Sequence, residues 1–310
     1  MEFQSSAQLI VYGILVFLGI LGNILVLVTI IATSTEYHSL AASDIILANL
    51  AAVNLLISTF RNILLFITES GVKMSLNLSW CKVFMFLWLW LKCVSVWVTF
   101  CLSCFHFLKI KQHFHLSTKM KEIIYVLVIL SGVWFVNFIY SIPAFVFTEK
   151  VGVNHTKKLM LVSTTEEPFL SCSWKFPSQQ HGIVFAAVSL ILHEFLPIVL
   201  MICTNLSTVY YLNEHIRAIA DDHLHSVQVE RTATKLIMAL VSLFVLCSGT
   251  HLVAVYYYNH NGGPATDFLL TLANYCAAVF IGFSPLMMAA GHSKLRNKVC
   301  SVLHINISSS

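Results

Sequence analysis

Three charged side chains lie deep inside long apolar stretches of the sequence, away from their ends: Arg61, Lys92 and Glu194. A charge in an apolar surrounding is costly, so such a residue is expected to pair with another charge or to serve a functional site. If each stretch is a helix, Lys92 lies roughly 16 Å below Cys81, and Glu194 lies roughly 16 Å below Ile183. Arg61 lies roughly 9 Å from the end of its own stretch. Two interpretations follow: a site for a charged small molecule, or mutual pairing without a ligand.

Motifs for catalysis or metal binding are weak in this chain. His193 and Glu194 begin like the helix motif of metalloproteases, but no second histidine follows at the required spacing. The run Asp-Asp-His-Leu-His at 221–225 has metal-ligating side chains, although a solvated loop is its more ordinary interpretation. The nine cysteines form no obvious metal or redox pattern, because most of them lie in apolar stretches, and no glycine-rich phosphate loop or nucleophile elbow is present. We therefore predict that the chain is not an enzyme and uses no metal or cofactor.

Composition indicates what surrounds these residues. Of 310 residues, 58% are hydrophobic and 10% are charged, whereas soluble domains carry about 25% charged residues. The net charge of +4 is modest and gives no reason to expect nucleic acid as a partner. Seven stretches reach the length of about 20 residues that a membrane-spanning helix needs, and the first is too long for a signal peptide. Their expected bounds are 9–32, 44–67, 82–108, 123–147, 182–212, 233–258 and 266–290. We predict an all-α, seven-transmembrane helix bundle.

The distribution of positive charge predicts the orientation of the bundle. With the N-terminus outside, the inner segments hold ten Lys and Arg residues and the outer segments hold six, in the sense of the positive-inside rule. The sequon Asn154-His155-Thr156 then lies in the long outer connection of residues 148–181, which makes Asn154 a candidate glycosylation site. We predict an extracellular N-terminus.

A cysteine pair would lie on the same outer side. Cys81 opens the third stretch and Cys172 lies in the long outer connection, and both would face an oxidising compartment. A disulfide between them would tie this connection over the mouth of the bundle, and in the chain-entropy model such a long closure is worth about 4–5 kcal/mol. The alternative is two unrelated thiols. We predict the disulfide.

Three functional classes are compatible with seven spans. A transporter is expected to show internal repeats with paired broken helices, and the sequence shows neither. A membrane enzyme would need a set of catalytic polar groups, which the motifs above do not supply. A receptor that couples an outer pocket to inner loops agrees best with the spans and the outer disulfide.

The motifs resemble those of the heptahelical G-protein-coupled receptors. Gly22-Asn23 in the first span and the Cys81/Cys172 pair carry this resemblance. Several mainstream signatures are missing: 105–110 reads Phe-His-Phe-Leu-Lys-Ile in place of the acidic-Arg-Tyr triplet, and the sixth span has no proline. In 47–51, Leu-Ala-Asn-Leu-Ala, we expect Ala51 at the position of the sodium-site aspartate.

These departures resemble the chemosensory branch that comprises type-1 vomeronasal receptors, related class A fish olfactory receptors and bitter taste receptors. The run 99–109, TFCLSCFHFLK, is similar to the third-span signature of that branch, and 291–296, GHSKLR, resembles the tail of bitter receptors. Ser284-Pro285 and the outer Cys172 favour the vomeronasal side, because bitter receptors generally lack the disulfide. The resemblance implies a plasma-membrane receptor for a small-molecule odorant or pheromone, signalling through a heterotrimeric G protein of the inhibitory type. A bitter taste receptor is the alternative, and a small-solute transporter is a more distant one.

The resemblance also places the third and fifth spans side by side. It therefore predicts a Lys92–Glu194 pair at the floor of an outer cavity, and a net positive charge there once Arg61 is counted. The expected ligand is a small organic acid held by Arg61 or Lys92. Trp88, four residues before Lys92, shares its helix face, and His193 and Asn62 are further lining candidates. The alternative for Arg61 is that it snorkels toward the membrane surface.

The inner surface is expected to contact the signalling partner. Lys109 and Lys111 belong to a basic loop suited to an acidic partner or anionic lipid, and the resemblance implies that His106, Lys109 and Lys111 contact the G protein. We divide the chain into a receptor domain, 1–290, and a short cytoplasmic tail, 291–310. The spacing of apolar residues in the tail predicts a short amphipathic helix lying on the membrane lipid.

Overall fold

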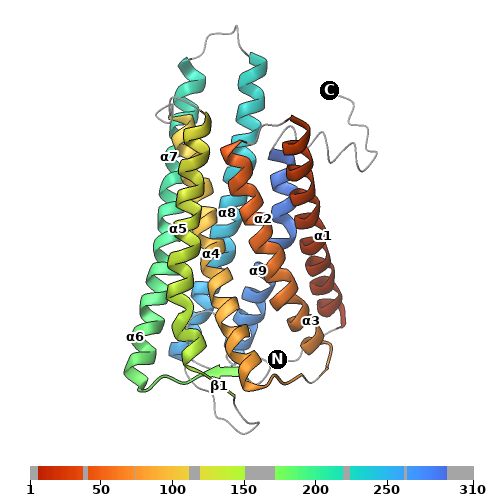
Figure 1. Ribbon diagram of the computed structural model, residues 1–310, viewed down its shortest axis with the longest axis vertical. Helices are drawn as coiled ribbons and strands as arrows, with labels where there is room; N and C mark the ends of the chain where they lie inside the picture. The colour runs from red at the N-terminus through yellow and green to blue at the C-terminus, as the bar shows by residue number, and fades with distance from the viewer. Residues whose placement is uncertain are drawn as a thin grey trace.

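The computed structural model describes residues 6–37, 41–72, 74–111, 119–150, 172–218, 224–261 and 264–291. These residues form a bundle of long helices that run roughly along one axis (Figure 1). The elements in chain order are α1 (Ser6–Tyr37), α2 (Ala42–Ile57), η1 (Ser58–Asn62), α3 (Ile63–Glu69), α4 (Leu78–Ile110), α5 (Lys119–Val146), β1 (Thr148–Lys150), β2 (Cys172–Trp174), α6 (Gln179–Leu190), η2 (Ile191–Phe195), α7 (Leu196–Ala218), α8 (Leu224–Asn261) and α9 (Pro264–Gly291).

Seven helical spans among the described residues are long and apolar enough to cross a membrane, which confirms the predicted count. Two of them are interrupted: α2, η1 and α3 form the second span, and α6, η2 and α7 form the fifth. The helices begin earlier or end later than the apolar stretches, because a helix continues past the hydrocarbon layer into its polar borders. The tail from residue 292 and its expected amphipathic helix lie outside the described residues.

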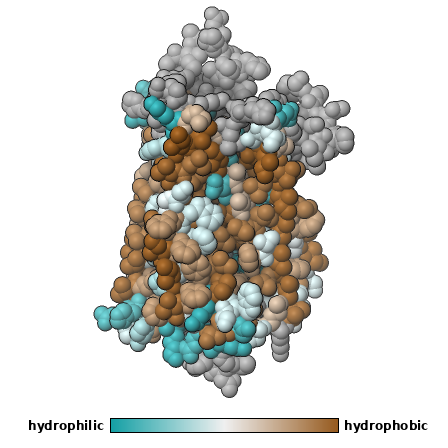
Figure 2. Space-filling view, viewed as in Figure 1, coloured by the Kyte–Doolittle hydropathy of each residue, from teal (hydrophilic) through white to brown (hydrophobic). Residues whose placement is uncertain are grey.

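The exposed surface is apolar around the middle of the bundle. Figure 2 shows mainly hydrophobic residues over the central part of one face and hydrophilic residues near the lower end. Large apolar side chains such as Phe17, Phe135, Leu206 and Leu246 are more than 60% exposed. A patch of this extent in water would drive aggregation, so it indicates a lipid environment.

Helix α4 is the central element. It packs against α2, α5, α7 and α8, while α1 packs against α2 and α9. Its start is fixed by Asn77, whose Oδ1 accepts a hydrogen bond from the backbone N–H of Trp80 at 3.0 Å and so caps the helix. Because α4 packs against α7 and α8, its residues, Lys92 among them, can contact the fifth and sixth spans.

Small residues let α1 and α9 approach closely. A Cβ added at Gly22 would lie 2.9 Å from Cβ and Cγ of Pro285, so only glycine fits at this contact. At the neighbouring residue of α9, Asn54 of α2 donates through Nδ2 to Ser284 Oγ at 3.1 Å. Asn54, three residues after Ala51, is thus a residue of α2 whose polar side chain faces α9, and it carries no charge.

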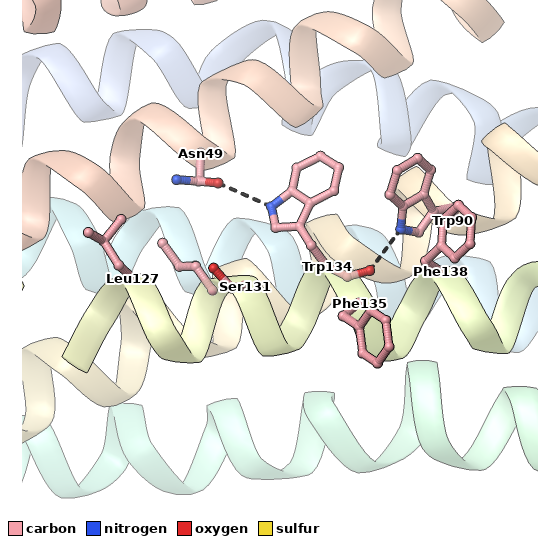
Figure 3. Close-up of a pocket in the computed structure, with 8 residues that line it drawn as sticks. Asn49, Trp90, Leu127, Ser131, Trp134, Phe135 and Phe138 are labelled. Carbon is pink, nitrogen blue, oxygen red and sulfur yellow. Dashed lines mark hydrogen bonds between the residues drawn. The ribbon is translucent and has the colours of Figure 1, made fainter. Parts of the chain in front are cut away.

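A shallow groove of about 450 Å³ lies on the lipid-facing side where α2, α4 and α5 meet. Trp134 of α5 is its centre: its Nε1 donates to Asn49 Oδ1 of α2, and its backbone carbonyl accepts from Trp90 Nε1 of α4, both at 3.1 Å (Figure 3). These bonds join three helices and already satisfy the indole donors. No ionisable side chain lines the groove among the described residues.

A disulfide and a two-stranded sheet close one end of the bundle, called the disulfide end below. Cys81 at the start of α4 is bonded to Cys172 of β2, as the sequence predicted. Strands β1 and β2 pair antiparallel, with Lys150 opposite Cys172, and this small sheet was not predicted. The bond therefore anchors β2 directly above the first turn of α4.

Candidate functional site

A buried cavity of about 90 Å³ lies among the second, third, fifth, sixth and seventh spans. All five residues predicted to contact a ligand line it: Arg61, Trp88, Lys92, His193 and Glu194. Its volume is below the 300–1,000 Å³ of pockets that take drug-sized molecules, so it suits a small ligand. Apolar side chains including Val96, Phe244 and Phe280 form much of the remaining wall.

Two π-helical turns place the polar residues of this cavity. The N–H of Ile63 bonds to the carbonyl of Ser58, and the N–H of Leu196 bonds to the carbonyl of Ile191, which is the i→i+5 pattern. The first turn carries Arg61 and Asn62, and the second carries His193 and Glu194. Such a turn inserts an extra residue into a helix and is frequent at functional sites.

Glu194 is the centre of a polar cluster that joins three spans. Its Oε1 lies 2.6 Å from Nζ of Lys92 on α4, and its Oε2 lies 3.2 Å from Nδ1 of His251 on α8. The Glu194 side chain is only 4% exposed, so its charge depends on these partners. The predicted Lys92–Glu194 pair is confirmed, and its two residues do lie at matched depth.

His193 is held by aromatic neighbours. Nε1 of Trp97 donates to Nδ1 of His193 at 3.1 Å, so Nδ1 acts as an acceptor and a neutral ring carries its proton on Nε2. The Tyr140 ring centre lies 4.1 Å from that of His193, and Phe185 stacks on Tyr140. Phe185 also contacts Trp174 of β2, so packing connects the disulfide end to the cavity.

Arg61 turns into the bundle and does not snorkel outward. Its guanidinium carbon lies 4.3 Å from the Trp88 ring centre, a cation–π contact. One terminal nitrogen donates to Oδ1 of Asn274 on α9 at 2.7 Å, and the other donates to Oδ1 of Asn62 at 3.4 Å. The cavity therefore has a fixed cation on one side and an ion-paired cluster on the other.

The cavity has the chemistry of a binding site. Its charged groups Arg61, Lys92 and Glu194 pair with one another, with His251 or with amides. Within the described ranges, no three His, Cys, Asp or Glu side chains are placed to hold a metal ion. Binding of a small polar molecule is the function that this arrangement can perform.

The residues expected to contact a G protein lie at the opposite end from the disulfide. Lys109 and Lys111, at the end of α4, are exposed, and Lys111 Nζ lies 5.3 Å from the Tyr211 ring centre of α7. His106 lies one turn earlier and is partly buried against Phe105. Asn154, the candidate glycosylation site, lies outside the described residues.

Comparisons with known proteins agree with this architecture. The family model of the 7 transmembrane receptor (rhodopsin family) matches residues 22–302. This chain belongs to that family. It is 42% identical over 312 residues to olfactory receptor class A-like protein 4 of Danio rerio, a match that covers 96% of this chain and 90% of that protein. It is also 22% identical to tachykinin-like peptides receptor 86C of Drosophila melanogaster, covering 92% of this chain and 54% of that one.

Family membership settles the broad class. The rhodopsin-family receptor is a multi-pass plasma-membrane protein that responds to a ligand through a heterotrimeric G protein, and it is not an enzyme. The transporter alternative is therefore wrong.

Sequence reasoning missed three residues of this receptor's cavity region. His251 lies within an apolar stretch just as Lys92 and Glu194 do, so the same criterion would have found it if histidine had been counted as ionisable. Asn274 and Trp97 act only through contacts with Arg61 and His193, which no local pattern reveals.

Proposed function

We propose that this receptor is a chemosensory, olfactory-type receptor that binds a small organic molecule in the cavity around Lys92 and Glu194. The observation that carries the proposal is the convergence of buried charged and polar side chains from five spans on one small cavity. Buried ionisable residues in a membrane protein mark functional sites by default. The 42% identity to an olfactory receptor class A-like protein supports an odorant or pheromone as the ligand.

The same proposal includes the orientation of the receptor in the membrane and its contact with a G protein. The N-terminus and the disulfide end face the extracellular side, where the charge distribution and the sequon at Asn154 favour them. His106, Lys109 and Lys111 at the other end contact a G protein, which the resemblance indicates to be of the inhibitory type. Residues 291–310 act as a cytoplasmic tail that lies on membrane lipid.

The vomeronasal and class A olfactory side is favoured over bitter taste. The disulfide between Cys81 and Cys172 is the specific support, because bitter receptors generally lack it. Expression in olfactory epithelium rather than in taste buds would be the expected localisation.

Ligand-dependent nucleotide exchange tests the function. Receptor purified in lipid nanodiscs is mixed with an inhibitory-type G protein, and binding of a GTP analogue is measured against a panel of small odorants. We expect at least one compound to accelerate exchange, and expect the double variant Lys92→Met, Glu194→Leu to weaken that response. A panel that leaves exchange at the basal rate would contradict the proposed function.

A further inference from the structure

The positive charge of Arg61 has no counter-ion among the described residues. Glu194, the carboxylate of the cavity, is already shared between Lys92 at 2.6 Å and His251 at 3.2 Å. Arg61 contacts instead the neutral amides of Asn62 and Asn274 and the ring of Trp88. A guanidinium remains charged in proteins, so this side of the cavity keeps an excess positive charge.

The two amides around Arg61 must present their nitrogen atoms elsewhere. A guanidinium only donates hydrogen bonds, so Asn62 and Asn274 both turn Oδ1 toward it. Their Nδ2 groups then remain as donors. Asn62 is 1% exposed, and its buried Nδ2 has no hydrogen-bond partner within the part of the chain that the structure describes. A buried donor left unpaired costs free energy, which a suitable acceptor would recover.

We propose that the cavity binds a small carboxylic acid in its ionised form, with the carboxylate accepting hydrogen bonds from Arg61 and Asn62. A carboxylate is acceptor-only, and thus complements a cation surrounded by amide donors. The apolar part of the acid packs against Val96, Phe244 and Phe280, which line the same cavity. The small volume of about 90 Å³ limits the acid to a few heavy atoms unless side chains move.

Lys92 is not the group that holds the acid. The sequence alone named Arg61 or Lys92 as the group that would hold the acid, but the ammonium of Lys92 is neutralised by Glu194. An acid that displaced Glu194 from Lys92 would leave that carboxylate buried with fewer partners, at a cost that binding would have to exceed. The Trp88 ring keeps the guanidinium in place, which lowers the entropy lost when an acid binds.

This inference rests on the proposed receptor function, and one experiment separates the two. Ethanoic, propanoic and butanoic acids, each with its primary amide, are tested on the receptor in nanodiscs for nucleotide exchange and, independently, for binding by ligand-detected NMR. We expect the acids to bind and to activate at concentrations at least 10-fold lower than their amides. Amides as potent as the acids would overturn the acid site and leave the receptor function standing. Acids that bind without promoting exchange would leave the site standing and contradict the function.

Two variants test the residues. Arg61→Gln removes the charge, and Asn62→Asp keeps the side-chain size but places a competing carboxylate beside Arg61. Each should weaken acid binding roughly 100-fold and change amide binding little, since a desolvated charge partner is lost or occupied. Lys175→Gln removes one positive charge at an exposed position outside the cavity and is the matched control, with unchanged acid binding expected. If Arg61→Gln does not fold, the near-isosteric Asn62→Asp still decides the matter, and unchanged acid binding in a folded variant overturns the proposal.

Discussion

Lys92 Nζ of α4 lies 2.6 Å from Glu194 Oε1 in the π-helical turn η2, so a buried ion pair ties the third span to the fifth. His251 of α8 bonds to the other oxygen of the same carboxylate and adds the sixth span. A ligand in this cavity contacts the point where three helices are held together. Binding of a ligand here can therefore alter the packing between these spans. Such a change would extend along the helices to the end opposite the disulfide, where Lys109 and Lys111 lie.

Glu194→Gln should destabilise the receptor strongly. The variant leaves the ammonium of Lys92, 20% exposed, without its counter-ion, and breaking one side of a buried pair costs about 3–5 kcal/mol. Replacing both residues, Lys92→Met with Glu194→Leu, should cost less than Glu194→Gln alone, because no unpaired charge remains. Thermal unfolding in detergent measures the difference.

The Glu149–Lys175 pair is the matched control for that cycle. It has a similar distance, 3.1 Å, but both side chains are exposed, so Glu149→Gln should cost about 0–1 kcal/mol. Equal destabilisation by Glu149→Gln and Glu194→Gln would contradict a special role of the buried pair.

Removal of the disulfide should also lower stability. Cys81 and Cys172 are both fully buried, and their bond closes a separation of 91 residues. In the chain-entropy model the loss amounts to about 4–5 kcal/mol. Cys81→Ser, Cys172→Ser and the double variant should therefore unfold at the same lowered temperature, whereas Cys203→Ser, at an exposed free thiol, should not differ from wild type. A double variant as stable as wild type would refute this prediction.

Gly22→Ala should weaken the contact between α1 and α9. The added Cβ would lie 2.9 Å from the rigid ring of Pro285, and overpacking of this kind costs about 1–3 kcal/mol. Gly249→Ala is the matched control, because a Cβ there meets nothing within 4 Å, and alanine favours a helix by about 0.5–1 kcal/mol over glycine. The two variants should shift the unfolding temperature in opposite directions, and a shared direction would contradict the assignment.

The sequence predicted the parts of this site that depend on burial and depth. The seven spans follow from apolar length alone, and Lys92 and Glu194 were paired because each lies about eleven residues, roughly 16 Å, into its helix. The position of a charge within an apolar stretch is enough to predict such a pair, because a charge in a membrane span must find a partner.

Details of rotation about the helix axis were not predictable. The sequence left the direction of Arg61 open, and it gave no indication that Asn54 would contact Ser284. A change of one residue in register rotates a side chain by about 100°, and the two π-helical turns each introduce such a change without a recognisable sequence signal. Contacts across spans, such as Asn274 with Arg61, depend on this rotation and were missed for the same reason.

Deletion of Leu192 should test whether the turn η2 exists to place His193 and Glu194. Leu192 is exposed on the lipid side, and its removal from a π-helical turn can restore the regular i→i+4 pattern while α6 and α7 keep their contacts. We expect a folded receptor in which Glu194 no longer meets Lys92, with the response in nucleotide exchange weakened at least 10-fold for any active ligand. Deletion of Leu206, in the regular part of α7, is the control: it rotates the rest of the span by about 100° and should prevent folding. If the Leu192 deletion retained full potency, or failed to fold as the Leu206 deletion should, then η2 would not be a local device for placing the site.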